Sequence, residues 1–133
     1  AFTPAALARA LAARRGPIKP ALLDQRIAAG IGNIYAAEAL WEARIDPRAA
    51  ASALGETQLR SLIAALRKVL RRARPGDGRY TTNRDAARWR VYDREGEACP
   101  RDGTDISRIV QAGRSTYFCA HCQVSRAPRA ARP

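Results

Sequence analysis

Gly30-Ile31-Gly32-Asn33-Ile34-Tyr35 lies between two segments whose apolar residues recur at helical spacing. Glycine allows backbone angles that other residues resist, so this stretch predicts a tight reversal between two helices. Asn33 falls at the expected cap of the second helix, where its side chain could accept hydrogen bonds from the first amides. Exposed amides and the positive end of the helix dipole favour an anion such as phosphate. An ordinary helical-hairpin turn with a capping asparagine explains the same residues about as well.

Helices are predicted on both sides of this turn. The first begins at Thr3-Pro4, a capping hydroxyl followed by proline, and ends at residues 14–17. The second runs from about residue 20 to residue 28, with Lys19 just outside its start, and the third runs from Asn33 to about residue 44. The fourth and longest carries an amphipathic stripe of Leu59, Leu62, Ile63, Leu66, Val69 and Leu70. We expect its basic outer face to be a solvated surface rather than a DNA contact.

The periodicity changes after the fourth helix. Residues 74–78 are rich in proline and glycine, residues 89–92 alternate like a strand, and residues 106–110 and 115–118 predict a hairpin that turns at residues 111–113. We therefore expect a mainly α fold: a four-helix domain over residues 1–74, a linker over 75–87, a hairpin module over 88–125 and a disordered basic tail over 126–133.

The charge balance predicts a nucleic acid as the partner. Lysine and arginine number 24 against 12 acidic residues, a net charge of +12, and most of the cations are arginine. Arginine suits bidentate contacts to phosphates and guanine edges, and an acidic membrane is the second choice. No apolar run is long enough for a membrane span, and no signal peptide is evident. Because the chain opens on Ala1 within helix-like sequence, we expect a C-terminal piece of a longer protein.

The cysteines predict a metal site. All three lie after residue 98, which does not make a disulfide framework and favours a reducing compartment. Cys99, Asp102, Cys119 and Cys122 follow the pattern C-x2-D-x16-C-x2-C, and thiolate and carboxylate are both accepted zinc ligands. His121 is a rival for the fourth ligand. A second alternative is a site that has lost its metal, with the hairpin held by its aromatic residues.

Two sets of residues resemble one family. Residues 18–25 (IKPALLDQ), 29–36 (AGIGNIYA) and 38–40 (EAL) resemble the helix–two-turns–helix signature of formamidopyrimidine-DNA glycosylases. Residues 92–99 (YDREGEAC) and 113–119 (GRSTYFC) resemble the C-terminal zinc finger of the same family. The closely related endonuclease VIII branch is the near alternative. The resemblance implies a helix–two-turns–helix domain followed by a small β-hairpin zinc finger with one structural zinc ion.

The resemblance also implies an activity. Members of the family are bifunctional enzymes of base-excision repair, which remove oxidised bases and then cut the abasic strand. Their reaction starts at an N-terminal proline, in a domain that we expect to be absent here, so this chain alone is expected to be catalytically incomplete. The implied partner is damaged double-stranded DNA, bound by a monomer in the bacterial cytoplasm in association with the nucleoid.

The motifs assign roles to individual residues. Lys19 and Asn33 match the family's ligands for phosphates that flank the lesion. Arg114, at the fingertip, matches an arginine that reaches the lesion phosphate and has a catalytic role in the final elimination. The implied DNA-binding set is completed by Arg14, Arg15, Gly32 and Tyr35. Glu38 is expected to be structural, pairing with a basic neighbour to orient the turn.

The sequence departs from the family in two places. Asp102 stands where the family has a zinc cysteine, and residues 81–92 leave little chain for the loop that closes over an extruded oxidised purine. A preference for 8-oxoguanine is therefore in doubt. Both departures would also fit a non-catalytic nucleic-acid-binding module or a diverged paralogue. An RNA-binding zinc ribbon of the ribosomal type would explain the charge and the cysteines, but not the turn at residues 30–35.

Overall fold

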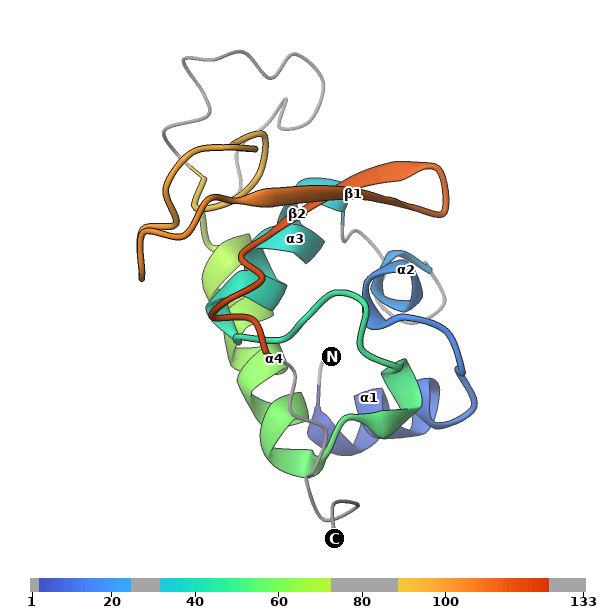
Figure 1. The fold of residues 1–133 in the computed structure, drawn as a ribbon. Helices are drawn as coiled ribbons and strands as arrows, with labels where there is room; N and C mark the ends of the chain where they lie inside the picture. The colour runs from blue at the N-terminus through green and yellow to red at the C-terminus, as the bar shows by residue number, and fades with distance from the viewer. Residues whose placement is uncertain (1–2, 25–31, 73–88, 125–133) are drawn as a thin grey trace, which may run out of the picture.

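The computed structural model describes residues 3–24, 32–72 and 89–124, and within them it confirms a mainly helical fold with one hairpin. The predicted linker (residues 75–87) and basic tail (residues 126–133) lie outside the described residues, and so does the shortened loop over residues 81–92, apart from residues 89–92. The elements, shown in Figure 1, are α1 (Pro4–Ala12), α2 (Ile18–Leu23), α3 (Asn33–Glu42), the short 3-10 helix η1 (Ala51–Ala53), α4 (Glu56–Leu70), β1 (Ser107–Gln111) and β2 (Arg114–Phe118).

The amphipathic stripe of α4 forms the centre of the helical core. Its predicted apolar residues are buried, apart from the half-buried Leu70, and they pack with apolar residues of α1, α2 and α3. The cations of the outer face are exposed apart from the half-buried Arg72, which follows the end of α4, and Lys68 and Arg72 form ion pairs with Glu42 of α3 at 3.2 and 3.3 Å. Among the described helices, none is both long and apolar enough to span a membrane.

Of the first two helix starts, one agrees with the prediction and one does not. The predicted cap of α1 is confirmed, because Thr3 Oγ1 accepts a hydrogen bond from the amide of Ala6 at 3.1 Å. However, α2 begins at Ile18, so Lys19 lies inside the helix and not before it. Pro20 is the third residue of α2 and not the first. Proline is tolerated there because the amides of the first helical turn have no acceptor within the helix, so its missing N–H costs no helical hydrogen bond.

The prediction that Asn33 caps α3 is wrong. Gly32 is the cap residue, and its carbonyl oxygen accepts the first helical bond from Ala36 at 2.9 Å, while Asn33 is already helical. The helix ends at Glu42, because Arg44 adopts a left-handed φ of 61° and the amide of Ile45 turns back to the carbonyl of Leu40. The first part of the predicted turn, residues 25–31, lies outside the described residues.

The predicted strand over residues 89–92 is also wrong. The amides of Arg90, Val91 and Tyr92 all donate hydrogen bonds to the carboxylate of Glu38, at 2.8 to 3.0 Å. In a strand, successive amides point alternately toward the two neighbouring strands, so three successive amides that converge on one carboxylate require the segment to bend instead. Glu38 is structural as expected, but its main partners are backbone amides and not a basic side chain.

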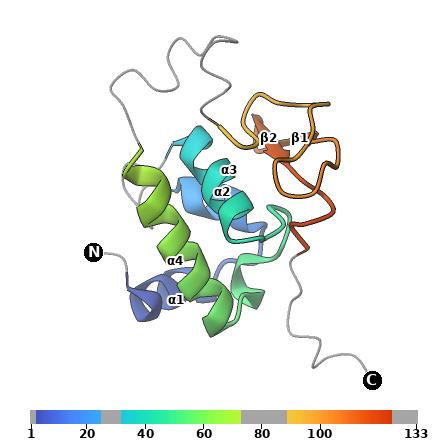
Figure 2. The same cartoon turned by 90° about the vertical axis from the view of Figure 1, so that its left-hand side faces the viewer.

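The predicted hairpin is confirmed, and it packs on the helical domain. Strands β1 and β2 are antiparallel and joined at Ala112 and Gly113, both with positive φ, as a tight two-residue hairpin turn requires. Figure 2 shows α3 between α4 and the hairpin module. The module has little core of its own, and it shares a cluster of buried residues with α3: Ala37, Trp41, Val91, Cys99, Ile106 and Cys119.

Candidate nucleic-acid interface and metal centre

Lys19, Asn33 and the hairpin meet at one point. The ammonium of Lys19 donates hydrogen bonds to the side-chain oxygen of Asn33 and to the main-chain oxygen of Ser115, the latter at 3.5 Å. The side-chain amide of Asn33 donates to the same Ser115 oxygen at 3.1 Å. Residues from α2, α3 and β2 are thereby joined beside Arg114, and this group is called the Lys19–Asn33 cluster below.

Positive charge in this cluster has no acidic counterpart. Lys19 is fully buried, and no carboxylate forms an ion pair with Lys19 or Arg114 in the part of the chain that the structure describes. Burial, and then the positive charge of Arg114, lower the pKa of Lys19 from 10.5 to about 8. Burying a cation without a counter-ion costs free energy, so an anion bound beside Lys19 would stabilise this cluster.

An anion would also stabilise the start of α3. Its cap residue, Gly32, makes no side-chain hydrogen bond to the first turn, and that turn contains no acidic residue. Within the described residues, no acidic side chain of the first turn offsets the positive end of the α3 dipole, and this adds to the positive potential of the Lys19–Asn33 cluster.

The other predicted DNA contacts have different surroundings. Arg14 is engaged in an ion pair with Asp24, whereas Arg15 is exposed. Both line a surface hollow where α1 meets α2. Tyr35 is half-buried and packs edge-on against Trp89, with ring centroids 6.2 Å apart. Arg114 is exposed at the hairpin turn.

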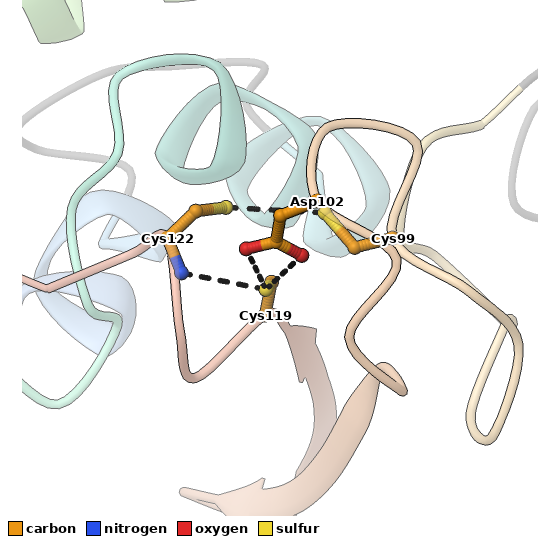
Figure 3. Close-up of side chains that lie close together, drawn as sticks. All are labelled: Cys99, Asp102, Cys119 and Cys122. Atoms are coloured by element: carbon orange, nitrogen blue, oxygen red, sulfur yellow. Dashed lines mark hydrogen bonds between the residues drawn. The ribbon is translucent and has the colours of Figure 1, made fainter.

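The four predicted metal ligands come together. Figure 3 shows Cys99, Asp102, Cys119 and Cys122 pointing toward one another, and one ligand atom from each lies within 4.8 Å of all the others. They arrive from two loops, one before β1 and one after β2, so the hairpin itself brings the pairs together. His121 stands outside this group, with its Nδ1 at 2.7 Å from Asp102 Oδ2.

The spacing of these atoms fits zinc. Tetrahedral zinc with bonds of about 2.3 Å to sulfur and about 2.0–2.2 Å to oxygen separates two sulfur ligands by about 3.8 Å, and sulfur from oxygen by about 3.5 Å. The Sγ atoms of Cys99 and Cys122 lie 3.9 Å apart, and Cys119 Sγ lies 3.5 Å from Asp102 Oδ1. The cluster could thus hold one zinc ion, which would crosslink the two loops.

Donors surround the sulfur atoms. Trp41 Nε1 and the amide of Arg101 each donate to Cys99 Sγ at 3.4 Å, and Arg101 Nη1 donates to Cys122 Sγ at 2.9 Å. N–H donors of this kind stabilise metal-bound thiolates. Burial, and then the Cys119 thiol, raise the pKa of Cys122 to about 12. Three sulfurs this close carry negative charge together only with a cation among them.

Two residues of this centre were missed from the sequence. Arg101 lies over the ring of Trp41, with its guanidinium carbon 3.9 Å from the centroid, and also donates to the Trp41 carbonyl at 2.9 Å. The position of Arg101 between Cys99 and Asp102 was the available signal, because a side chain in that turn has to lie near the ligands. The role of Trp41 had no such signal, since it depends on how the module sits on α3.

Two family models match this chain, one over the helical domain and one over the hairpin module. Residues 1–84 match the family model described as the formamidopyrimidine-DNA glycosylase H2TH domain, where H2TH stands for helix–two-turns–helix, and residues 96–124 match the zinc finger found in FPG and IleRS. The formamidopyrimidine-DNA glycosylase of Chloroflexus aurantiacus is 50% identical over 135 residues, which cover 93% of this chain and 48% of that protein.

Solved structures agree with this result. The MutM (FPG) protein of Thermus thermophilus superposes with a TM-score of 0.82 at 41% identity, over 92% of this chain and 50% of that one. Lactococcus lactis Fpg, solved non-covalently bound to DNA containing an AP site, gives a TM-score of 0.81 at 36% identity, over 92% of this chain and 47% of that one. The chain thus spans about half the length of the relatives that it matches. It belongs to the formamidopyrimidine-DNA glycosylase family.

Proposed function

We propose that this chain is the DNA-gripping half of a bifunctional DNA glycosylase and AP lyase, which excises oxidised bases from double-stranded DNA. The observation that carries the proposal is the Lys19–Asn33 cluster, where a buried cation that has no acidic partner among the described residues meets an exposed arginine beside a helix start whose cap residue is Gly32. Phosphate is the anion that best suits such a site. The Lactococcus lactis relative, bound to DNA with an AP site, supports damaged DNA as the partner.

Each predicted residue has a role in this proposal. Lys19 and the α3 amides bind one phosphate beside the lesion, and Asn33 holds Lys19 toward it. Arg114 reaches a second phosphate from the hairpin turn. Because a guanidinium keeps its proton in proteins, Arg114 would assist elimination by stabilising charge on the leaving phosphate and not by donating a proton.

The remaining residues extend this surface. Arg15 is exposed and available for a phosphate, whereas Arg14, bound to Asp24, is better placed to hold the α1–α2 connection that presents Arg15. Gly32 allows close approach of DNA to the start of α3, because a Cβ added there would meet nothing within 4 Å in the protein. Tyr35 supports the same turn through its contact with Trp89. We expect the protein to bind DNA as a monomer, in the bacterial nucleoid.

Zinc has a structural part in this proposal. Bound by Cys99, Asp102, Cys119 and Cys122, it would crosslink the loops at the base of the hairpin and so fix the direction in which Arg114 projects. All four positions are taken by protein ligands, and a closed site of this kind supplies folding energy and no reactive water.

Binding to a duplex with a stable abasic-site analogue tests the DNA grip. Asn33→Ala and Arg114→Ala should each weaken binding, whereas Arg60→Ala, which removes an exposed charge paired with Glu56 on α4, should not. With about four phosphates neutralised, log affinity should fall against log salt with a slope of about −3.6. A slope near zero, or equal losses in all three variants, would contradict the proposed grip.

A chimaera tests the reaction. The N-terminal half of the Chloroflexus aurantiacus relative, joined to this chain, should cleave an abasic strand, and sodium borohydride should trap it on the DNA. Arg114→Ala in the chimaera should slow strand cleavage more than it weakens binding. A chimaera that folds and binds the duplex but never cleaves it would favour a non-catalytic binding module.

A further inference from the structure

The carboxylate of Asp102 is held from two sides. Its Oδ1 accepts a hydrogen bond from the amide of Thr104 at 2.9 Å, and its Oδ2 lies 2.7 Å from His121 Nδ1. The two oxygens lie 3.5 and 3.6 Å from the sulfur of Cys119. The Asp102 side chain is only 18% exposed, so it faces the sulfur atoms and not the solvent.

A carboxylate in a thiolate position needs such support. Sulfur offers zinc one soft donor atom, whereas a carboxylate has two equivalent oxygens and can rotate between them or turn to water. The two hydrogen bonds, one to each oxygen, fix the plane of the group, and each oxygen keeps a second lone pair that can bind the metal. Metal-binding carboxylates are hydrogen-bonded for this reason, and loss of the partner costs metal affinity.

His121 supplies this hydrogen bond and has no other visible use. Its side chain is 74% exposed, so packing does not explain it, and in the described part of the chain Asp102 is its one recorded partner. It lies between Cys119 and Cys122, so the turn that presents two ligands also presents the imidazole.

We propose that Asp102 is the fourth ligand of a zinc site with three sulfurs and one oxygen, and that His121 is the positioning residue that makes this carboxylate an effective ligand. The proposal rests on the zinc site proposed above and is independent of DNA binding. The carboxylate at residue 102 is thereby supported from within the neighbouring turn.

The test is a double-mutant cycle read by metal affinity. Zinc affinity is measured by competition with a chromogenic chelator for the wild-type chain, His121→Ala, Asp102→Cys and the double variant. His121→Ala should weaken zinc binding by about 10- to 100-fold. In the Asp102→Cys background the same substitution should have little effect, because no carboxylate remains for the imidazole to hold.

Two further variants separate positioning from direct ligation. His121→Asn places an amide nitrogen where Nδ1 was and should restore much of the affinity, while Asp102→Asn should lose it. The absorption spectrum of the cobalt(II) form should keep its tetrahedral bands in His121→Asn. Zinc kept by Asp102→Asn and lost by both His121 variants would make His121 the ligand and overturn the proposal. So would an equal effect of His121→Ala in both backgrounds, or a wild-type chain that binds no zinc.

Discussion

The side-chain amide of Asn33 donates a hydrogen bond to the main-chain oxygen of Ser115 at 3.1 Å, across 82 residues of sequence. This bond joins the first residue of α3 to the residue that follows Arg114. The bond therefore fixes the two predicted phosphate contacts, Asn33 and Arg114, relative to each other, since neither can shift without straining it. We therefore expect Asn33 to affect both the stability of the protein and the proposed binding of DNA.

Substitutions of Asn33 should separate these two effects. Asn33→Ala removes the bond to Ser115 and an acceptor of Lys19, and should destabilise the fold by about 1–3 kcal/mol. Asn33→Asp places a negative charge beside Lys19 and at a helix start, so it should melt at a higher temperature than Asn33→Ala. It should nevertheless bind DNA more weakly, because the carboxylate occupies the anion site. Thermal unfolding and fluorescence anisotropy would show these opposite orders, and one common order would contradict the argument.

Lys19 predicts a pH dependence. Its pKa of about 8 in the folded protein, against 10.5 ordinarily, means that between these values the unfolded chain binds a proton that the folded chain has lost. Lys19 should therefore make stability rise with pH over that window. DNA affinity should change in the opposite direction, falling above about pH 8, because a phosphate needs the charged ammonium. Lys19→Met, measured at constant ionic strength, should flatten the fall in affinity, and an unchanged pH profile would exclude Lys19 as its source.

The sequence was sufficient for local structure and for ligand spacing. Neighbours in the sequence determine the apolar stripe of α4, the Thr3 cap and the hairpin turn. They also determine how the metal ligands pair, since two residues separate Cys99 from Asp102 and Cys119 from Cys122. The errors arose where a distant segment took over a side chain. Asn33 does not cap its helix because Lys19 and Ser115 engage it, and residues 89–92 do not form a strand because Glu38 binds their amides.

The position of the hairpin on the helical domain could not be predicted either. It depends on individual long-range hydrogen bonds, such as Gln111 Nε2 to the carbonyl of Pro47 at 3.1 Å and Gln123 Nε2 to the carbonyl of Ile45 at 3.0 Å. A glutamine at the end of a strand, such as Gln111, or in a loop, such as Gln123, belongs to no periodic pattern that would reveal such a partner. The convergence of Lys19 with Arg114 follows from this docking, so only the resemblance to a family could anticipate it.

Glu38 should be required for the order of the segment that enters the hairpin module. Glu38→Gln replaces one carboxylate oxygen by an NH2 group that cannot accept, which leaves at least one of the three buried or partly buried donors unsatisfied and costs about 1–3 kcal/mol. Hydrogen exchange should accelerate at the amides of residues 90–92 and stay slow in α4. Uniform acceleration across both regions would mean that Glu38 supports the whole fold and not this segment.

Arg101 should be required for the attachment of the metal centre to α3. Its guanidinium lies over Trp41, donates to the Trp41 carbonyl and donates to Cys122 Sγ, three contacts that one planar fork can make together. Arg101→Ala should lose about 0.5–2 kcal/mol from the ring contact and about 1.5–3 kcal/mol from a charged hydrogen bond, although the two are not additive.

Arg101→Lys keeps the charge but not the geometry, and should recover little of the loss. Arg60→Ala serves as the matched control, since that arginine is exposed and its ion pair within the described residues is with Glu56 of the same helix. The measurements are the rate of zinc release to a chelator and the thermal midpoint of unfolding. Full recovery by lysine would show that charge alone matters, and the stacking on Trp41 would then have no part in holding the finger.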